Sequence, residues 1–144
     1  MLMLSPDSKY YGFDLFEDAT AETDAVEKNV KPHHSLRSVR AYLDGFDVEL
    51  YKGNTRQTLS QFTKPVDFVW LDGGHSVETI RSDLDNVLRV LTPGGLLFLD
   101  DYYTGLDTEL YGCNEVVRYY DHYVIPIEDN VAGGGKVQMV RVYA

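Results

Sequence analysis

Acidic side chains follow the short apolar runs of this sequence. Asp14 and Glu17 lie at the end of a run that begins at Tyr10. Asp72 follows a second run, and the adjacent pair Asp100 and Asp101 follows a third. An acid after a strand can accept hydrogen bonds from both hydroxyls of a ribose. Ionised groups in such numbers are hard to explain as packing, so we expect chemistry at these positions.

Two turns beside these acids are suited to a close ligand. The stretch Asp72-Gly73-Gly74-His75 has no Cβ at its centre, so a ligand can approach the backbone there. Ser76 follows, and the unpaired amides of a helix starting at Ser76 add a weakly positive field. We interpret His75 as a site residue; the alternative is a polar group at the entry to that helix. The turn Gly53-Asn54-Thr55 ends another apolar run in the same way.

The residues Asp72, Asp100 and Asp101 could surround a divalent cation. Mg²⁺ takes oxygen ligands, keeps several waters and needs only a few protein carboxylates. Without a cation, carboxylates so near to one another would raise one another's pKa values. The alternative is that Asp100 caps the following turn while Asp101 faces solvent.

The apolar pattern predicts an α/β fold that places these residues at strand ends. Strands are predicted at residues 10–16, 48–51, 66–71, 96–99, 123–127 and 136–143, and helices at 35–43, 55–62, 77–91 and 114–123. Strands that alternate with helices indicate a Rossmann-like, mostly parallel sheet, and the last two strands indicate a C-terminal antiparallel pair. The register of the last strand is uncertain, because its pattern shifts at Met139-Val140. Ligands bind such sheets at the carboxyl ends of the strands.

Three local predictions concern packing and capping. The run 66–71 is almost uniformly apolar, which predicts a central strand covered on both faces, with Trp70 in the core. Thr55 is predicted to cap a short helix that buries Leu59 and Phe62. Ser76 is predicted to cap the helix that follows residue 76, in which apolar residues recur at steps of three and four.

Composition and net charge limit the functions that this chain can have. The chain has 144 residues, which we interpret as a single domain spanning 1–144, and a net charge of −10 from 23 acidic and 13 basic residues. That charge argues against binding to nucleic acid or to an anionic membrane, and no apolar run is long enough to span one. One cysteine, Cys113, allows no internal disulfide, so a cytoplasmic location is expected. Cys113 is interpreted as a small buried hydrophobe rather than a nucleophile.

The segment VDFVWLDGGHSVETIRSDLDNVLRVLTPGGLLFLDDYY resembles the second half of a class I S-adenosylmethionine-dependent methyltransferase. Within that fold, the DGGHS and PGG…DDY motifs at this spacing resemble the macrocin O-methyltransferase type. The segments YYGFDLFED and YKGNTRQTL resemble the second and third strands of the same group.

The resemblance implies roles for individual residues. Asp14 matches the acid that holds the cofactor ribose, with Glu17 as a second candidate. Asn54 and Thr55 match the turn that lines the adenine. Asp72, with Gly73 beside it, matches the position near the methionine part of S-adenosylmethionine.

The same resemblance implies a metal-assisted reaction. Asp100 and Asp101 match the carboxylates that bind Mg²⁺ together with Asp72 in metal-dependent members. His75 falls where a base could reach a hydroxyl of a small-molecule acceptor, so Asp72 and His75 are the catalytic candidates. A hydroxyl held by a metal is more acidic and is positioned for attack on the sulfonium methyl.

One feature departs from the family pattern. The family's first strand and glycine-rich loop should precede Tyr10, but only nine residues do, and none reads as E/D-x-G-x-G. We therefore expect a sheet that lacks this strand between the strands at 10–16 and 66–71, and interpret the chain as a fragment, a mis-started gene product or a degenerate relative. The two strands could pair directly, residues 1–4 could supply a short strand, or a second copy could pair there and form a homo-oligomer.

The sequence raises three candidate functions. The first is methyl transfer from S-adenosylmethionine to a small-molecule hydroxyl with Mg²⁺. The second is a non-catalytic module that keeps the methyltransferase shape for binding or oligomerisation, as the absent glycine loop suggests. A nicotinamide-dependent oxidoreductase would need G-x-G-x-x-G after a first strand, and the sequence has none.

Overall fold

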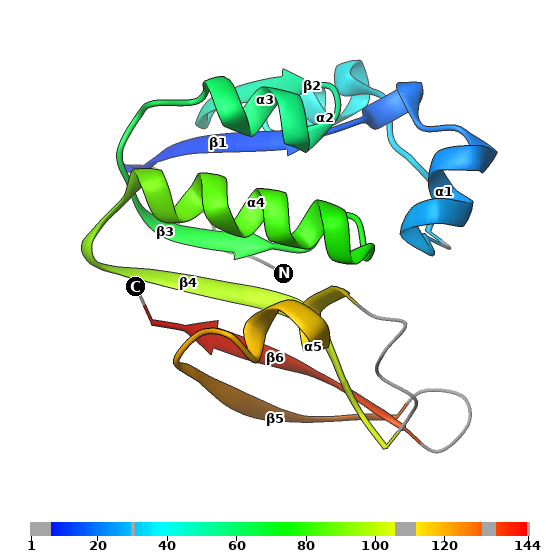
Figure 1. Ribbon diagram of the computed structural model, residues 1–144. Coiled ribbons are helices and arrows are strands. Elements are labelled where there is room, and N and C mark those ends of the chain that lie inside the picture. The colour runs from blue at the N-terminus through cyan, green and yellow to red at the C-terminus, as the bar shows by residue number, and fades with distance from the viewer. Residues whose placement is uncertain (1–6, 30, 106–111, 131–134, 144) are drawn as a thin grey trace.

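The computed structural model of the chain describes residues 7–29, 31–105, 112–130 and 135–143. Figure 1 shows short helices alternating with strands along most of this length. In chain order the elements are β1 (Lys9–Asp14), the 3-10 helix η1 (Phe16–Asp18), α1 (Ala21–Glu27), α2 (Leu36–Tyr42), β2 (Asp47–Lys52), α3 (Thr55–Gln61), β3 (Val66–Leu71), α4 (Val77–Val90), β4 (Leu91–Thr104), α5 (Gly112–Val117), β5 (His122–Asn130) and β6 (Lys136–Val142). Among these helices, none combines the length and the apolar character needed to cross a membrane.

The strands form two sheets. β1 and β2 pair in parallel. The second sheet has the order β3-β4-β6-β5, in which β3 and β4 are parallel and β6 is antiparallel to both of its neighbours. The predicted α/β fold with a C-terminal antiparallel pair is therefore confirmed.

The carboxyl ends of β1 and β3 point to the same side of the molecule, and α1 lies on that side (Figure 1). Within the described residues, β1 pairs only with β2, and β3 pairs only with β4. Direct pairing of β1 with β3, one of the arrangements considered from the sequence, is therefore not formed. The short strand considered at residues 1–4 lies outside the described residues.

Helix α4 anchors the core. Its start is capped by Ser76, whose Oγ accepts the Thr79 N–H at 3.2 Å, as predicted. Ile80, Leu84 and Val87 recur on one face of the helix and are all nearly fully buried. They cluster with inward-facing residues of β4, β6 and α5, namely Leu97, Leu99, Val140, Val142, Val116 and Val117. This packing fixes the carboxyl end of β3 and the start of α4 relative to each other.

Among the described residues, strand β3 is covered on one face only, so the prediction of a strand covered on both faces is wrong. Phe68 is 49% exposed and Trp70 is 36% exposed, and both rings lie beside that of Phe98 on β4. Val69 and Leu71 point the other way and pack against the core. Because successive side chains of a strand point to opposite faces, the face opposite α4 keeps Phe68 and Trp70. The prediction of Trp70 as a core residue is also wrong.

The turn after β2 is capped by a different residue from the one predicted. Asn54 caps α3, since its extended backbone lets the side-chain oxygen accept the Arg56 N–H at 2.9 Å. Thr55 is the first residue of the helix, so its assignment as the cap is wrong. Leu59 and Phe62 are buried as predicted, each at 6% exposure.

Candidate active site

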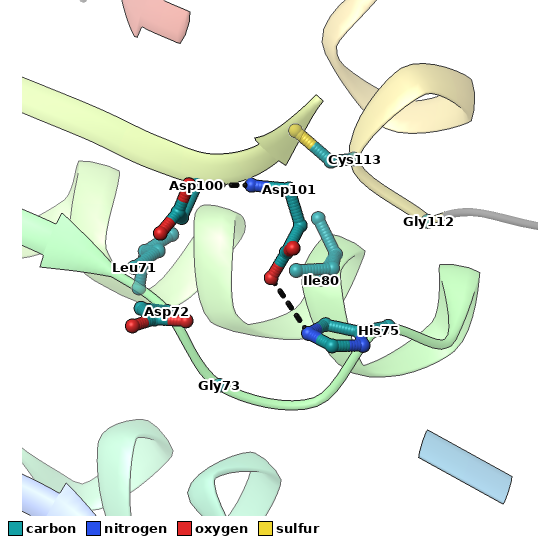
Figure 2. Close-up of a pocket in the computed structure, with 9 residues that line it drawn as sticks. All are labelled: Leu71, Asp72, Gly73, His75, Ile80, Asp100, Asp101, Gly112 and Cys113. Carbon is teal, nitrogen blue, oxygen red and sulfur yellow. Dashed lines mark hydrogen bonds and ion pairs between the residues drawn. The ribbon is translucent and has the colours of Figure 1, made fainter. Parts of the chain in front are cut away.

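A pocket lies at the carboxyl end of β3, in the place the sequence predicts (Figure 2). Its polar groups come from the turn after β3 and from the middle of β4: Asp72, His75, Asp100 and Asp101. Small and apolar residues complete its lining, namely Leu71, Gly73, Ile80, Gly112 and Cys113. Five of the predicted site residues therefore lie in one pocket.

A bulge in β4 sets the direction of Asp101. The register of β4 against β6 shifts between Leu99 and Tyr102, so Asp100 and Asp101 oppose a single residue of β6. Asp101 has a φ of +59°, in the left-handed region that residues other than glycine rarely adopt. The Asp100 carboxylate accepts the Asp101 N–H at 2.9 Å and supports this conformation. The bulge directs the Asp101 side chain toward the turn after β3 (Figure 2).

Asp101 and His75 form an ion pair. Asp101 Oδ2 lies 2.7 Å from His75 Nε2, and both side chains are less than one-fifth exposed. The hydrogen bond to Asp101 raises the pKa of His75, although burial acts in the opposite direction. Burial acts to raise the pKa of Asp101, but the hydrogen bond and the charge of His75 outweigh it and lower that pKa. His75 is thereby a stronger base than an ordinary histidine.

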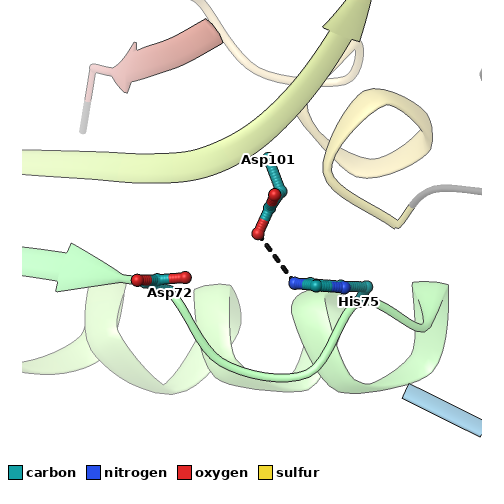
Figure 3. A group of neighbouring side chains, drawn as sticks. All are labelled: Asp72, His75 and Asp101. Carbon is teal, nitrogen blue, oxygen red and sulfur yellow. Dashed lines mark ion pairs between the residues drawn. The ribbon is translucent and has the colours of Figure 1, made fainter. Parts of the chain in front are cut away.

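A third ligand atom lies beside this pair. Asp72, His75 and Asp101 each offer one possible metal-ligating atom, and these atoms lie within 4.8 Å of one another (Figure 3). Burial raises the pKa of Asp72, Lys31 opposes this, and the charges of Asp100 and Asp101 add to it. A carboxylate with that bias toward protonation is stabilised in its ionised form when a cation binds.

The donor set differs from the predicted carboxylate trio. Asp72 and Asp101 come together as predicted, but His75 occupies the third place. Asp100 lines the same pocket, and its Oδ1 atom is engaged with the Asp101 backbone. Two carboxylates suit Mg²⁺ or Mn²⁺, and an imidazole ligand extends the set to transition metals. The residues present therefore fit a divalent cation, with His75 available either as a ligand or as a base.

The predicted ribose acids lie at the end of β1 and outside the lining of this pocket. Asp14 is exposed, and its carboxylate accepts the Phe16 N–H. Glu17 forms an ion pair with Lys52 at 2.7 Å and accepts the Leu36 N–H at the same distance. These two partners lower the pKa of Glu17 to about 2. Of the two acids, Asp14 has only a local partner among these contacts, whereas Glu17 is committed to a neighbouring lysine.

A buried acid connects the turn after β2 to α4. Asp83 is 4% exposed, and its Oδ1 atom has no hydrogen-bond partner among the described residues. Burial raises the pKa of Asp83 to about 6, although a hydrogen bond with Thr55 acts to lower it. The charge of Glu27 adds to the rise, and the charge of Arg56 opposes it. Sequence reasoning did not single out Asp83. Its only signal was an acidic residue adjacent to Leu84 in an otherwise regular apolar stripe.

Two further residues support the site and were missed. The Tyr103 hydroxyl donates to Asp101 Oδ1 at 2.8 Å, on the opposite side of the carboxylate from His75. Glu27 belongs to an acidic run that is typical of a solvated face, yet its carboxylate contacts the start of α4. The Glu27 contacts have no local sequence signal, because they join segments 49 and 52 residues apart. The Tyr103 contact lies within β4 and depends on the bulge at Asp100 and Asp101.

Cys113 is not suited to nucleophilic chemistry. It is 2% exposed, and burial raises the pKa of its thiol to about 12, with the charges of Asp101 and Asp100 acting in the same direction. The interpretation of Cys113 as a small buried hydrophobe is confirmed.

Comparison with known families decides the broader class. A family model described as a methyltransferase domain matches residues 2–102, more than half of the chain. The chain belongs to this family. Its fold is that of class I S-adenosylmethionine-dependent methyltransferases. No curated relative matches the sequence.

Solved structures share the fold of this methyltransferase at low sequence identity. A Clostridium thermocellum protein described as an rRNA methylase superposes with a TM-score of 0.61 at 16% identity, over 96% of this chain and 74% of that one. A Streptococcus mutans protein described as a methyltransferase, solved with S-adenosylhomocysteine, gives 0.58 at 18% identity, over 94% and 76% of the two chains. CalS11, a TDP-rhamnose 3'-O-methyltransferase of calicheamicin biosynthesis, gives 0.57 at 17% identity, over 95% and 60%.

Proposed function

We propose that this methyltransferase transfers a methyl group from S-adenosylmethionine to a hydroxyl of a small molecule, assisted by Mg²⁺ or a similar cation, and that it is of the macrocin O-methyltransferase type. The observation that carries the proposal is the convergence of Asp72, His75 and Asp101 within 4.8 Å at the end of β3. A base and two carboxylates in one pocket suit the activation of a hydroxyl group.

Residues at three strand ends would hold the cofactor. Asp14 would accept hydrogen bonds from the ribose, and Asn54 and Thr55 would lie beside the adenine. Asp72 and Gly73 would lie near the methionine part. Bound S-adenosylmethionine supplies an electrophilic methyl group on a positively charged sulfur. The acidic residues at these strand ends suit a ligand that carries positive charge.

Asp72 and Asp101 would hold the cation, with Asp100 beside them in the pocket as a further carboxylate. When bound, the cation supplies positive charge that stabilises negative charge on the acceptor oxygen. Asp101 is oriented for this role by the Tyr103 hydroxyl and by the β4 bulge. His75 would take the proton of the acceptor hydroxyl at the ring nitrogen that is not paired with Asp101, and the pair with Asp101 strengthens it as a base.

A second candidate is a non-catalytic module with the methyltransferase shape. It is favoured by the arrangement of the strands, since no described strand joins β1 to β3 and the predicted ribose and metal residues sit on different sheets. A protein of this kind would bind a nucleoside or a partner without transferring a methyl group.

A transfer assay combined with a binding assay separates the two candidates. The protein is incubated with S-adenosylmethionine labelled in the methyl group, with a panel of small hydroxylated acceptors, and with or without Mg²⁺. Binding of S-adenosylhomocysteine is measured in parallel by titration calorimetry. Labelled methyl ethers that require both Mg²⁺ and His75 support the enzyme. Calorimetric binding with no labelled product across the panel supports the non-catalytic module.

A further inference from the structure

Glu27, the last residue of α1, meets the start of α4. Its Oε2 atom accepts the Ser76 N–H at 2.9 Å. Its Oε1 atom accepts the hydroxyls of Ser76 at 3.1 Å and Thr79 at 2.7 Å. Its backbone carbonyl accepts the His75 N–H at 3.2 Å. One residue of α1 therefore binds both the amide of His75 and the first turn of α4.

These polar contacts attach α1 to the turn after β3 and to the start of α4. Asp24 of the same helix pairs with His33 at 2.7 Å. No residue of α1 is buried, and Val26 is 64% exposed. A helix of seven residues is unstable without tertiary contacts, so its position depends on what it binds. Lys31, just beyond α1, adds only a long ion pair of 3.9 Å with Asp72. The carboxylate of Glu27 thus helps to hold α1 at the carboxyl ends of β1 and β3.

The turn after β3 is shaped to receive Glu27. A Cβ placed on Gly74 would lie 2.6 Å from Cδ of Glu27, and its nearest neighbours are all atoms of that side chain. A Cβ placed on Gly73 would meet nothing within 4 Å. Neither glycine has a positive φ that would disfavour alanine. A Cβ at position 74 would therefore displace the Glu27 carboxylate, whereas the backbone conformation of Gly74 does not itself demand glycine.

We propose that Glu27 is a positioning residue of the active site. Its carboxylate and carbonyl hold the turn from Asp72 to Ser76 in the conformation that presents His75 to Asp101. The same contacts hold α1 beside the strand ends. The role assigned to Glu27 rests on the function proposed for His75, whereas the contact itself does not.

Loss of the carboxylate would act on the turn directly. The Ser76 and Thr79 donors would lose their acceptor, and α1 would lose part of its attachment. The His75 amide would then exchange with solvent more readily, and its imidazole would spend less time opposite Asp101. The effect on chemistry would pass through His75 alone.

A double-mutant cycle tests the contact. Protein labelled with ¹⁵N-histidine has four histidine amides, so the His75 signal can be followed and assigned with a His75 variant. We expect Glu27→Ala to speed hydrogen exchange of the His75 amide by about tenfold or more, and Gly74→Ala to do the same by displacing the carboxylate. The double variant should show no more than either single change. Gly73→Ala and Glu22→Ala serve as controls in this measurement and should leave the exchange unchanged.

A second measurement tests the role in catalysis. We expect Glu27→Ala to lower kcat for methyl transfer with a smaller change in the affinity for S-adenosylhomocysteine, and to have no further effect when His75 is already replaced by Gln. Glu27→Gln, which keeps one acceptor oxygen, should recover part of both the exchange protection and kcat.

Several outcomes would overturn the proposal: additive effects of Glu27→Ala and Gly74→Ala, an unchanged His75 amide in Glu27→Ala, or a kcat loss that persists in the His75→Gln background. The exchange cycle needs no activity. A protein that transfers no methyl group therefore refutes the proposed function, while the exchange data still decide whether Glu27 holds the turn.

Discussion

Asp101 reaches His75 because β4 bulges where its apolar stretch ends. The bulge gives Asp101 a left-handed backbone and aims its Oδ2 atom at His75 Nε2, 2.7 Å away. Tyr103 occupies the other carboxylate oxygen at 2.8 Å. Bulges next to functional sites commonly redirect a side chain in this way. The pair therefore depends on the pairing of β4 with β6 as well as on the residues themselves.

Replacement of His75 tests the proposed base. We expect His75→Gln to lower the rate of methyl transfer by about 10²–10⁴-fold, the usual contribution of a general base. Transfer of a labelled methyl group under saturating cofactor measures it. His122→Gln is the matched control, since His122 lies at the start of β5 and outside the pocket lining. Equal rates for the parent and His75→Gln would remove His75 from the chemistry.

The metal site predicts a change in thermal stability. Mg²⁺ or Mn²⁺ should raise the melting temperature, because a ligand that binds only the folded state stabilises it by about 2.7 kcal/mol at a hundred times its Kd. Asp101→Asn should abolish this rise. Asp67→Asn, which removes an exposed carboxylate of β3, should retain it. Scanning calorimetry with and without the ion provides the measurement, and an unchanged parent transition would contradict the site.

The two candidate ribose acids can be told apart by substitution. Asp14→Ala should weaken binding of S-adenosylhomocysteine by about 1.5–3 kcal/mol, the scale of hydrogen bonds to a charged group. Glu17→Gln should have a smaller effect, because the Glu17 carboxylate is already engaged with Lys52. Titration calorimetry on both variants decides between them. A larger loss in Glu17→Gln would exchange the two assignments.

Much of the fold could be predicted because its signals are local. The apolar stripe of α4 and its Ser76 cap predict that helix closely, and the apolar run before Asp72 predicts β3. The coverage of β3 could not be predicted, since a uniformly apolar run does not show how many helices pack against it. The length of α5 was overestimated, because the aromatic residues after Val117 continue a helical pattern although β5 begins at His122.

The candidate site, like the fold, could be predicted only in part. The convergence of Asp72 and Asp101 could be predicted, since Asp72 follows β3 and Asp101 follows the apolar stretch of the parallel neighbour β4. The continuation of β4 to Thr104 beyond this acid pair was not predicted. The β4 bulge could not be predicted either, although the shift of pattern at Met139 lies on β6 opposite it. Contacts from Glu27 depend on the path of a segment far away in the sequence. Such long-range contacts leave no trace in local periodicity.

Asp83 predicts a dependence of stability on pH. Its pKa of about 6 lies above the ordinary value of 3.8, because burial disfavours the charged form. The folded state therefore binds the proton more tightly than the unfolded state, and its stability falls as pH rises from about 4 to 6. Above pH 6, Asp83→Asn should reduce this loss of unfolding free energy by up to about 3 kcal/mol. Denaturant unfolding at pH 4 and pH 7 measures it.

The control for that measurement lies on the same helix. Asp85→Asn removes an exposed carboxylate of α4 and should leave the pH dependence of the parent intact. If Asp83→Asn shows the same change in unfolding free energy between the two pH values as the parent, Asp83 does not titrate in this range.

The uncovered face of β3 and β4 predicts self-association. Phe68 and Trp70 lie beside Phe98 on this face and keep a large part of their surface in contact with solvent. Burial of such aromatic surface against a second copy is favourable, whereas the net charge of −10 opposes close approach of two copies. Salt screens that repulsion, so association should strengthen with both protein concentration and ionic strength.

Size-exclusion chromatography with light scattering measures this association. Phe68→Lys should shift the protein toward monomer, while Tyr42→Lys, which removes an exposed aromatic residue from α2, should not. A parent that stays monomeric at high salt contradicts this prediction. Association that survives Phe68→Lys would point to the edges of β1 and β3 with which no described strand pairs.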